Sequence, residues 1–139
     1  MKIKSTTPIL RSYDEDKGKE FYVNFLEFEI EFEHRFEENT PLYIGLIKSG
    51  FRLHLSEHYG DSTPITSIRI ELENLESFHK KLSDKNYKHC RPSIIKQDWG
   101  TMEMLIDDPF GNRLVFYKNI NSLSFDVLLL RKNKRRDYR

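Results

Sequence analysis

The stretch GTMEMLIDDPFGNRLVFYK, residues 100–118, decides the fold. Two runs rich in apolar residues, 100–107 and 112–118, flank the tetrapeptide DPFG. Within it, Pro109 fixes one backbone angle and Gly111 tolerates the positive φ that a tight reversal often needs. The pattern therefore predicts two strands joined by a turn.

The half of the chain that ends in this hairpin begins with a strand, a helix and a further strand. The alternating run ITSIRIELE (65–73) is typical of a strand with one buried face. Segment 74–87 predicts a helix capped by Asn74, and segment 91–97 predicts a short strand. Four helix residues share one face at helical spacing: Leu75, Phe78, His79 and Leu82.

The first half of the chain repeats this order, offset by about 59 residues. Asp14 is expected to cap a helix over 14–28. The run FEIEFE (28–33) alternates strictly, which predicts a half-buried strand with its three glutamates on one face. The remaining strand-like runs cover 9–13, 42–47 and 51–57.

The fold class that follows is α+β, with two copies of a βαβββ module. Module one is expected at about 6–58 and module two at about 64–118, within a single domain of residues 1–118. Residues 119–139 are expected to form a C-terminal extension.

Composition favours an ordinary globular protein, with 37% hydrophobic and 32% charged residues among the 139. No run of about 18 apolar residues is present, so we expect no membrane span. The start of the chain lacks the apolar core of a secretion signal, and Cys90 is the one cysteine, which excludes an internal disulfide. We therefore expect a cytoplasmic protein.

The extension has a strongly basic end, because residues 131–139 carry a net charge of +5 and leave the rest of the chain at about −4. Such a run can bind nucleic acid or membrane phosphates, but terminal charge runs are usually solvated, so we expect no nucleic-acid partner. Preceding it, three apolar residues are spaced for a short helical stripe, with a disordered tail as the alternative: Leu123, Val127 and Leu130.

Three segments carry a family resemblance: EFYVNFLEFEI (20–30), RIELENLESFHKKL (69–82) and DWGTMEMLIDDPFGNRLVFY (98–117). Together they resemble the vicinal-oxygen-chelate superfamily, which includes glyoxalase I, extradiol dioxygenases, and fosfomycin and bleomycin resistance proteins. The last segment is most similar to the bleomycin resistance branch. The resemblance implies that the two modules form a cupped mixed β-sheet and that the protein is a homodimer.

A possible metal site is suggested by LHLSEHYGD (53–61), where His54, Glu57 and His58 are residue types that bind zinc or iron. Strand alternation, however, sends Glu57 to the face opposite His54. His58 lies past the expected strand end. The stretch is therefore interpreted as a strand end.

The resemblance also implies where a metal would be held, at four positions of this chain: Thr7, His54, Ser67 and Val115. Among these only the imidazole is a good ligand, because valine cannot coordinate and hydroxyls bind zinc or iron poorly. We therefore expect no metal and no cofactor.

Other catalytic signatures are missing as well, since the sequence has no glycine-rich phosphate loop and no GxSxG motif. Cys90 follows His89, but neighbours in a strand point to opposite faces, so no nucleophile–base pair is implied. No catalytic residues are predicted.

Strand alternation assigns a polar face to the sheet, which the resemblance identifies as a pocket surface. Its expected members are Arg52, His54, Ser56, Ser67, Arg69, Glu71, Val115 and Tyr117. The alternative is a plain solvated face, which antiparallel sheets often have.

Aromatic residues are the candidate walls for a flat guest. Trp99, the one tryptophan, precedes Gly100 and can lie as a stacking platform, or it can cap the core. Phe32, Phe36 and Tyr43 are the other predicted walls, or else plain core residues.

Acidic residues are dense between 27 and 38: Glu27, Glu29, Glu31, Glu33, Glu37 and Glu38. They predict a solvated strand face or an electronegative rim that attracts a cation. Glu103 is expected to face the same groove.

Three function hypotheses remain. The first is a metal-free antibiotic-resistance protein that sequesters a bleomycin-like or other planar cationic molecule in a groove of a homodimer. The second is a metal-dependent lyase, dioxygenase or thiol transferase of the same fold. The third is an interaction module that has lost the pocket and uses the basic tail.

Overall fold

The computed structural model describes residues 1–120. The basic run at 131–139 and the apolar stripe after residue 120 therefore lie outside the described residues. Within the described part, no helix is long and apolar enough to cross a membrane.

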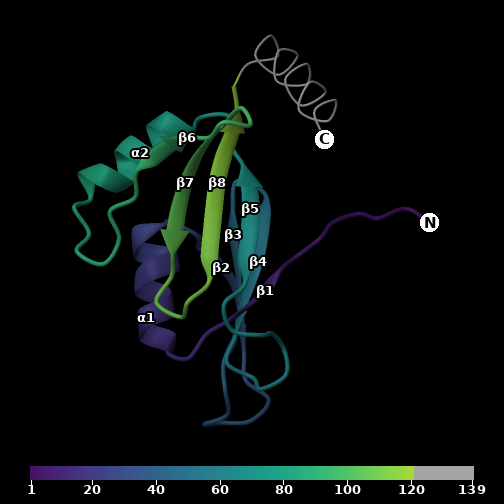
Figure 1. Ribbon diagram of the computed structural model, residues 1–139. Helices are drawn as coiled ribbons and strands as arrows, with labels where there is room; N and C mark the ends of the chain where they lie inside the picture. Colours follow the sequence, from purple (N-terminus) through teal and green to yellow (C-terminus); the bar gives the residue numbers. More distant parts are fainter. Residues whose placement is uncertain (121–139) are drawn as a thin grey trace. The chain divides into compact units, whose positions relative to one another are not determined.

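Module one has the predicted βαβββ order (Figure 1). Its sheet has the order β1-β4-β3-β2, with β1 parallel to β4 and the other pairs antiparallel. Its elements are β1 (Ile9–Arg11), α1 (Glu15–Lys19), the π-helical turn η1 (Glu20–Phe25), β2 (Glu29–His34), β3 (Tyr43–Lys48) and β4 (Phe51–Ser56).

Module two repeats the order, and its sheet is arranged β5-β8-β7-β6. The N–H of Arg113 donates a hydrogen bond to the carbonyl of Thr66, and the N–H of Leu72 donates one to the carbonyl of Tyr117. Strands β5 and β8 are therefore parallel. The elements are β5 (Ser67–Glu71), α2 (Leu75–Asp84), β6 (Ile94–Lys96), β7 (Thr101–Asp107) and β8 (Arg113–Asn119). The predicted α+β fold of two βαβββ modules, each with a mixed sheet, is confirmed.

The chain folds as two compact units. Of the described residues, one unit contains 1–67 together with 107–113, and the other contains 68–106 together with 114–120. The turn of the last hairpin thus belongs to the unit of module one. The single domain over 1–118 stays a prediction.

The helix of module one begins where its sequence indicates, because the Asp14 carboxylate accepts a 2.9 Å bond from the N–H of Lys17. The helix of module two begins after Asn74 as expected, but the Asn74 side chain makes no capping hydrogen bond. Leu75 and Leu82 are buried, and Phe78 packs edge-on against Phe116 at 5.1 Å.

Strand β2 departs from its sequence pattern, because the half-buried face predicted for it is wrong. Ile30 and Phe32 are 40% and 42% exposed. β2 lies at the edge of its sheet and has a register shift between these two residues, so strict alternation breaks. Glu31 consequently pairs with Arg52 of β4, whereas Glu33 pairs with Lys19 of α1.

The predicted DPFG turn is confirmed and is organised by a buried carboxylate. Asp108 accepts bonds from the backbone N–H groups of Phe110 and Asn112, and also from the Asn112 amide and the Tyr22 hydroxyl. Burial, followed by the negative charge of Asp108, raises the pKa of Tyr22 well above its usual value. Gly111 has a φ of +89°, as expected for this turn.

Candidate ligand-binding site

A surface pocket opens on the sheet of module one, with a cavity volume of about 360 Å³. It is formed by β2, the start of β3 and the loop after β4. Its lining residues are Phe32, His34, Phe36, Tyr43, His58 and Asp61.

One wall is a fixed aromatic stack. The Phe32 ring lies parallel to that of Tyr43, with centroids 6.1 Å apart and an interplanar angle of 9°. A Cβ atom on Gly45 would lie 2.2 Å from the Phe32 ring, so the ring occupies the space that a missing side chain leaves. The glycine in β3 therefore allows Phe32 to lie flat on the sheet.

His54 supports this stack from beside the pocket. Its ring contacts Phe32 and Tyr43 edge-on, and its Nδ1 lies 2.7 Å from the Tyr43 hydroxyl. Burial lowers the pKa of His54; the charge of Glu31 opposes this shift, and the nearby Arg52 acts in the same direction as burial. The imidazole serves as a hydrogen-bond partner for Tyr43.

The opposite wall is the Phe36 ring, which is 72% exposed. It meets the imidazoles of His34 and His58 edge-on, with centroids 4.7 and 5.3 Å away. The Nε2 atom of His58 is buried without a hydrogen-bond partner among the described residues. A solvent-facing ring of this size is available to stack on a flat guest.

Asp61 supplies a negative charge to the pocket. Its carboxylate accepts a 2.6 Å bond from the buried Ser56 hydroxyl, which in turn accepts a bond from the N–H of His58. Among residues 1–120 no cationic side chain pairs with Asp61. Burial is the main cause that raises the pKa of Tyr43, and the negative charge of Asp61 is the second.

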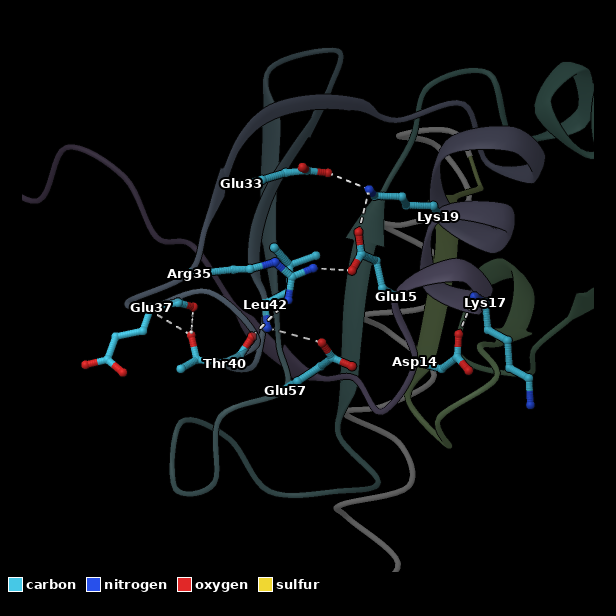
Figure 2. A network of polar contacts seen from close by, with 10 residues as sticks. All are labelled: Asp14, Glu15, Lys17, Lys19, Glu33, Arg35, Glu37, Thr40, Leu42 and Glu57. Carbon is cyan, nitrogen blue, oxygen red and sulfur yellow. Dashed lines mark hydrogen bonds and ion pairs between the residues drawn. The ribbon is translucent and has the colours of Figure 1, made fainter.

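A polar network ties the loop that carries Phe36 to helix α1 (Figure 2). Glu15 binds both Lys19 and Arg35, and Lys19 reaches Glu33 of β2 at 2.7 Å. Lys19 and Arg35 lower the pKa of Glu15 through these bonds. The guanidinium of Arg35 also donates a 2.9 Å bond to the carbonyl of Thr40.

Module two carries a second polar cluster on its own sheet. Glu103 accepts bonds at one oxygen from Arg69 at 2.9 Å, Thr101 at 2.7 Å and the Trp99 indole at 3.3 Å. The Arg69 guanidinium lies 4.3 Å from the centre of the Tyr117 ring. Arg69 is the largest cause that lowers the pKa of Glu103, so the carboxylate is ionised and satisfied.

The predicted site residues therefore fall into separate groups. Phe32, Phe36 and Tyr43 line the module-one pocket, with His54 and Ser56 beside it. The cluster on module two contains Trp99, Arg69, Glu103 and Tyr117, and Gly100 is buried next to it in sequence with a φ of +91°. Arg52 is paired with Glu31, and Glu71 is exposed on β5 outside the cluster.

Sequence reasoning missed three pocket residues, His34, His58 and Asp61. His58 and Asp61 belong to the HYGD segment after β4, where Gly60 adopts a φ of +93° and lets the chain turn back. That segment, which joins a histidine and an aspartate through a glycine turn, is the signal that could have found them.

Comparison with known proteins agrees with this architecture. The family model described as "Glyoxalase superfamily protein" matches residues 1–122. The chain belongs to the glyoxalase superfamily. No curated protein matches its sequence.

Several solved structures share the glyoxalase-superfamily fold with this chain. A bleomycin-binding protein complexed with bleomycin is 23% identical with a TM-score of 0.67, covering 84% of this chain and 99% of its own. The bleomycin-binding protein of bleomycin-producing Streptomyces verticillus, complexed with copper(II)-bleomycin, is 25% identical with a TM-score of 0.61, covering 88% and 99%. A bleomycin resistance determinant encoded on the transposon Tn5 is 21% identical with a TM-score of 0.64, covering 84% and 98%.

The metal of some members of this superfamily does not fit the residues found here. Among the four ligand positions, Val115 is a buried hydrocarbon and His54 already binds the Tyr43 hydroxyl through Nδ1. Within residues 1–120, no group of three or more His, Cys, Asp or Glu side chains could hold a metal ion. No step of a mechanism is therefore assigned to a metal.

Proposed function

We propose that this glyoxalase-superfamily protein binds and sequesters a planar, cationic small molecule of the bleomycin class without transforming it. The observation that carries the proposal is the module-one pocket, whose lining combines three aromatic rings, two imidazoles and the carboxylate of Asp61. Relatives in fold that are complexed with bleomycin support the same ligand class.

The pocket chemistry favours a flat aromatic guest with a positive charge. An exposed ring such as Phe36 offers stacking surface, and aromatic faces attract cations with about 0.5–2 kcal/mol. Asp61 adds a full negative charge that no cationic side chain of the described residues neutralises. A neutral or anionic guest would gain no attraction from this charge.

The acidic stretch at 27–38 is a weaker candidate for this role. Glu31 and Glu33 are engaged by Arg52 and Lys19, respectively. We therefore assign the recognition of charge to Asp61 in the first place.

The remaining parts of the proposal concern assembly and location. We propose a homodimer that binds its ligand in a groove, and a cytoplasmic protein in keeping with its single cysteine. Light scattering coupled to size-exclusion chromatography tests the assembly, since a mass of 16.7 kDa would contradict it.

Isothermal titration of the purified protein with metal-free bleomycin tests the function. We expect saturable binding with a dissociation constant of about 1 µM or tighter, equivalent to about 8 kcal/mol. Phe36→Ala should weaken binding about tenfold by removing the exposed stacking ring. Tyr13→Ala, which removes an exposed ring outside the pocket, is the matched control and should leave the affinity unchanged.

Mass spectrometry of the ligand after incubation completes the test. Recovery of unchanged bleomycin agrees with sequestration, whereas a modified product would contradict it. Absence of binding up to millimolar bleomycin, with the protein folded by circular dichroism, would overturn the proposed function.

A further inference from the structure

We infer that Arg35 is a positioning residue that holds the Phe36 wall of the pocket in place by clamping its loop to helix α1. The inference rests on the proposed function, because it concerns how the same pocket is kept ready for its guest. The evidence is the polar network around Glu15 (Figure 2).

Arg35 lies between two pocket residues, His34 and Phe36, but its own side chain turns away to the helix. Its guanidinium binds the Glu15 carboxylate on α1 and the carbonyl of Thr40 in the β2–β3 loop. The rings of His34 and Phe36, the two sequence neighbours of Arg35, pack against each other with centroids 4.7 Å apart, so an anchor at Arg35 restrains the backbone that carries both rings. One side chain thus joins the helix, the loop and the end of β2.

The helix end of this clamp is itself held. Lys19 binds Glu15 at 2.9 Å and Glu33 of β2 at 2.7 Å. Glu33, Lys19, Glu15 and Arg35 therefore form a chain of alternating charge that begins and ends on the same segment. Networked ion pairs hold their geometry better than isolated exposed pairs do.

The loop between β2 and β3 has few other restraints. Thr40 and Glu37 close it internally, with the Thr40 hydroxyl accepting a 3.0 Å bond from the N–H of Glu37 and donating a 2.6 Å bond to its carbonyl. At the far end, the N–H of Leu42 reaches the Glu57 carboxylate at 3.2 Å. These contacts shape the loop from within, whereas Arg35 connects its first residues to the helix.

Phe36 depends on this connection because packing hardly holds its ring. The ring is 72% exposed, and its aromatic contacts are the edges of His34 and His58. Without the clamp, we expect the loop to sample positions in which Phe36 no longer faces the pocket. Only the protein molecules whose Phe36 faces the pocket would then bind the guest, so the apparent affinity would be lower.

Amide hydrogen exchange in the absence of ligand tests the clamp directly. In Arg35→Gln, the amides of Glu37 and Thr40 should exchange about fivefold faster than in the wild type, because local opening of the loop becomes easier. Arg113→Gln is the matched control, since it removes an exposed Arg–Asp pair with Asp107, outside the pocket. It should leave these two amides unchanged.

Titration with metal-free bleomycin gives the second readout. Arg35→Gln and Glu15→Gln should each weaken binding about three- to tenfold, and the double variant should be no worse than either, because both remove the same clamp. The charge-swapped pair Arg35→Glu with Glu15→Arg should recover at least about half of the lost affinity. The urea midpoint should change no more in Arg35→Gln than in Arg113→Gln.

The inference and the proposed function fail separately. The clamp is overturned if Arg35→Gln binds bleomycin as tightly as the wild type and its loop amides exchange at the wild-type rate. A wild type that does not bind bleomycin at all overturns the proposed function, whatever the exchange rates are.

Discussion

Asp61, in the loop after β4, and Glu103, on β7, are both carboxylates near aromatic rings, but they differ in their partners. Glu103 is buried and accepts three side-chain bonds, one of them from the Arg69 guanidinium. Asp61 is exposed and accepts one bond, from Ser56. The same repeated fold thus carries one carboxylate that is satisfied by neighbouring side chains and one that is exposed to solvent.

The contrast separates two uses of a carboxylate. A carboxylate surrounded by donors stabilises the fold, and removing it leaves those donors without partners. An exposed carboxylate that lacks a cation contributes little to folding and remains available for binding. Each use predicts a different response to substitution.

The largest effect is expected at Asp108, the most completely satisfied carboxylate. Asp108→Ala removes the acceptor for two backbone N–H groups, the Asn112 amide and the Tyr22 hydroxyl, so it should lower the free energy of unfolding by about 3–5 kcal/mol. Urea denaturation measures the loss. The neighbouring Asp107 is exposed and paired with Arg113, so Asp107→Ala should lower the free energy of unfolding by about 1 kcal/mol or less. Equal losses in the two variants would contradict the structural role given to Asp108.

Glu103→Gln should come next, with a loss of about 1.5–3 kcal/mol at neutral pH, because hydrogen bonds to a charged group contribute more than neutral ones. Arg69 lowers the pKa of Glu103 in the folded protein. Its contribution is therefore fully present above the unfolded-state pKa, about 4.3, and is lost as the pH falls through the lower folded pKa.

Urea denaturation of wild type and Glu103→Gln as a function of pH checks that dependence. The difference between their free energies of unfolding should be constant from neutral pH down to about 5 and shrink on further acidification. A difference that grows as the pH falls would contradict the role given to Arg69.

Asp61→Asn should change the free energy of unfolding by about 0.5 kcal/mol or less, because the amide oxygen can still accept the Ser56 bond. The affinity for bleomycin should nevertheless fall about tenfold. Calorimetric titration and urea denaturation of the same preparation measure both quantities. Glu38→Gln removes an equal charge outside the pocket lining and serves as the control. A strongly destabilised Asp61→Asn would place Asp61 in the same class as Glu103.

The smallest effect is expected at Arg52, a predicted ligand-binding residue that is instead engaged by Glu31 on the exposed face. Arg52→Gln should alter stability by about 0–1 kcal/mol and leave the bleomycin affinity within about twofold. A tenfold loss of affinity in the calorimeter would restore Arg52 to the site.

The repeated fold was predictable because its signals are local. The helical spacing of Leu75 and Leu82 indicates which face of the helix is buried, and both side chains are buried as expected. The DPFG tetrapeptide forms the expected turn. The exposure of Phe32 was not predictable, since alternation does not tell which strand lies at a sheet edge.

The pairing within the candidate surfaces was harder to predict for the same reason. Arg69 and Glu103 are 34 residues apart and meet because β5 and β7 flank β8, which requires the strand order. Asp61 depends on the positive φ of Gly60 and on the buried Ser56 hydroxyl, features of a loop without periodicity. Residue types indicated which charges and rings could bind a ligand, whereas the three-dimensional structure was needed to show which of them lie together.

The most direct test asks where the guest lies. Nuclear Overhauser effects between saturating metal-free bleomycin and the side-chain protons of the protein would locate it. We predict contacts to the ring protons of Phe36, Tyr43 and His58, the walls around the open carboxylate. Saturable binding that gives contacts elsewhere and none to these rings would contradict the account.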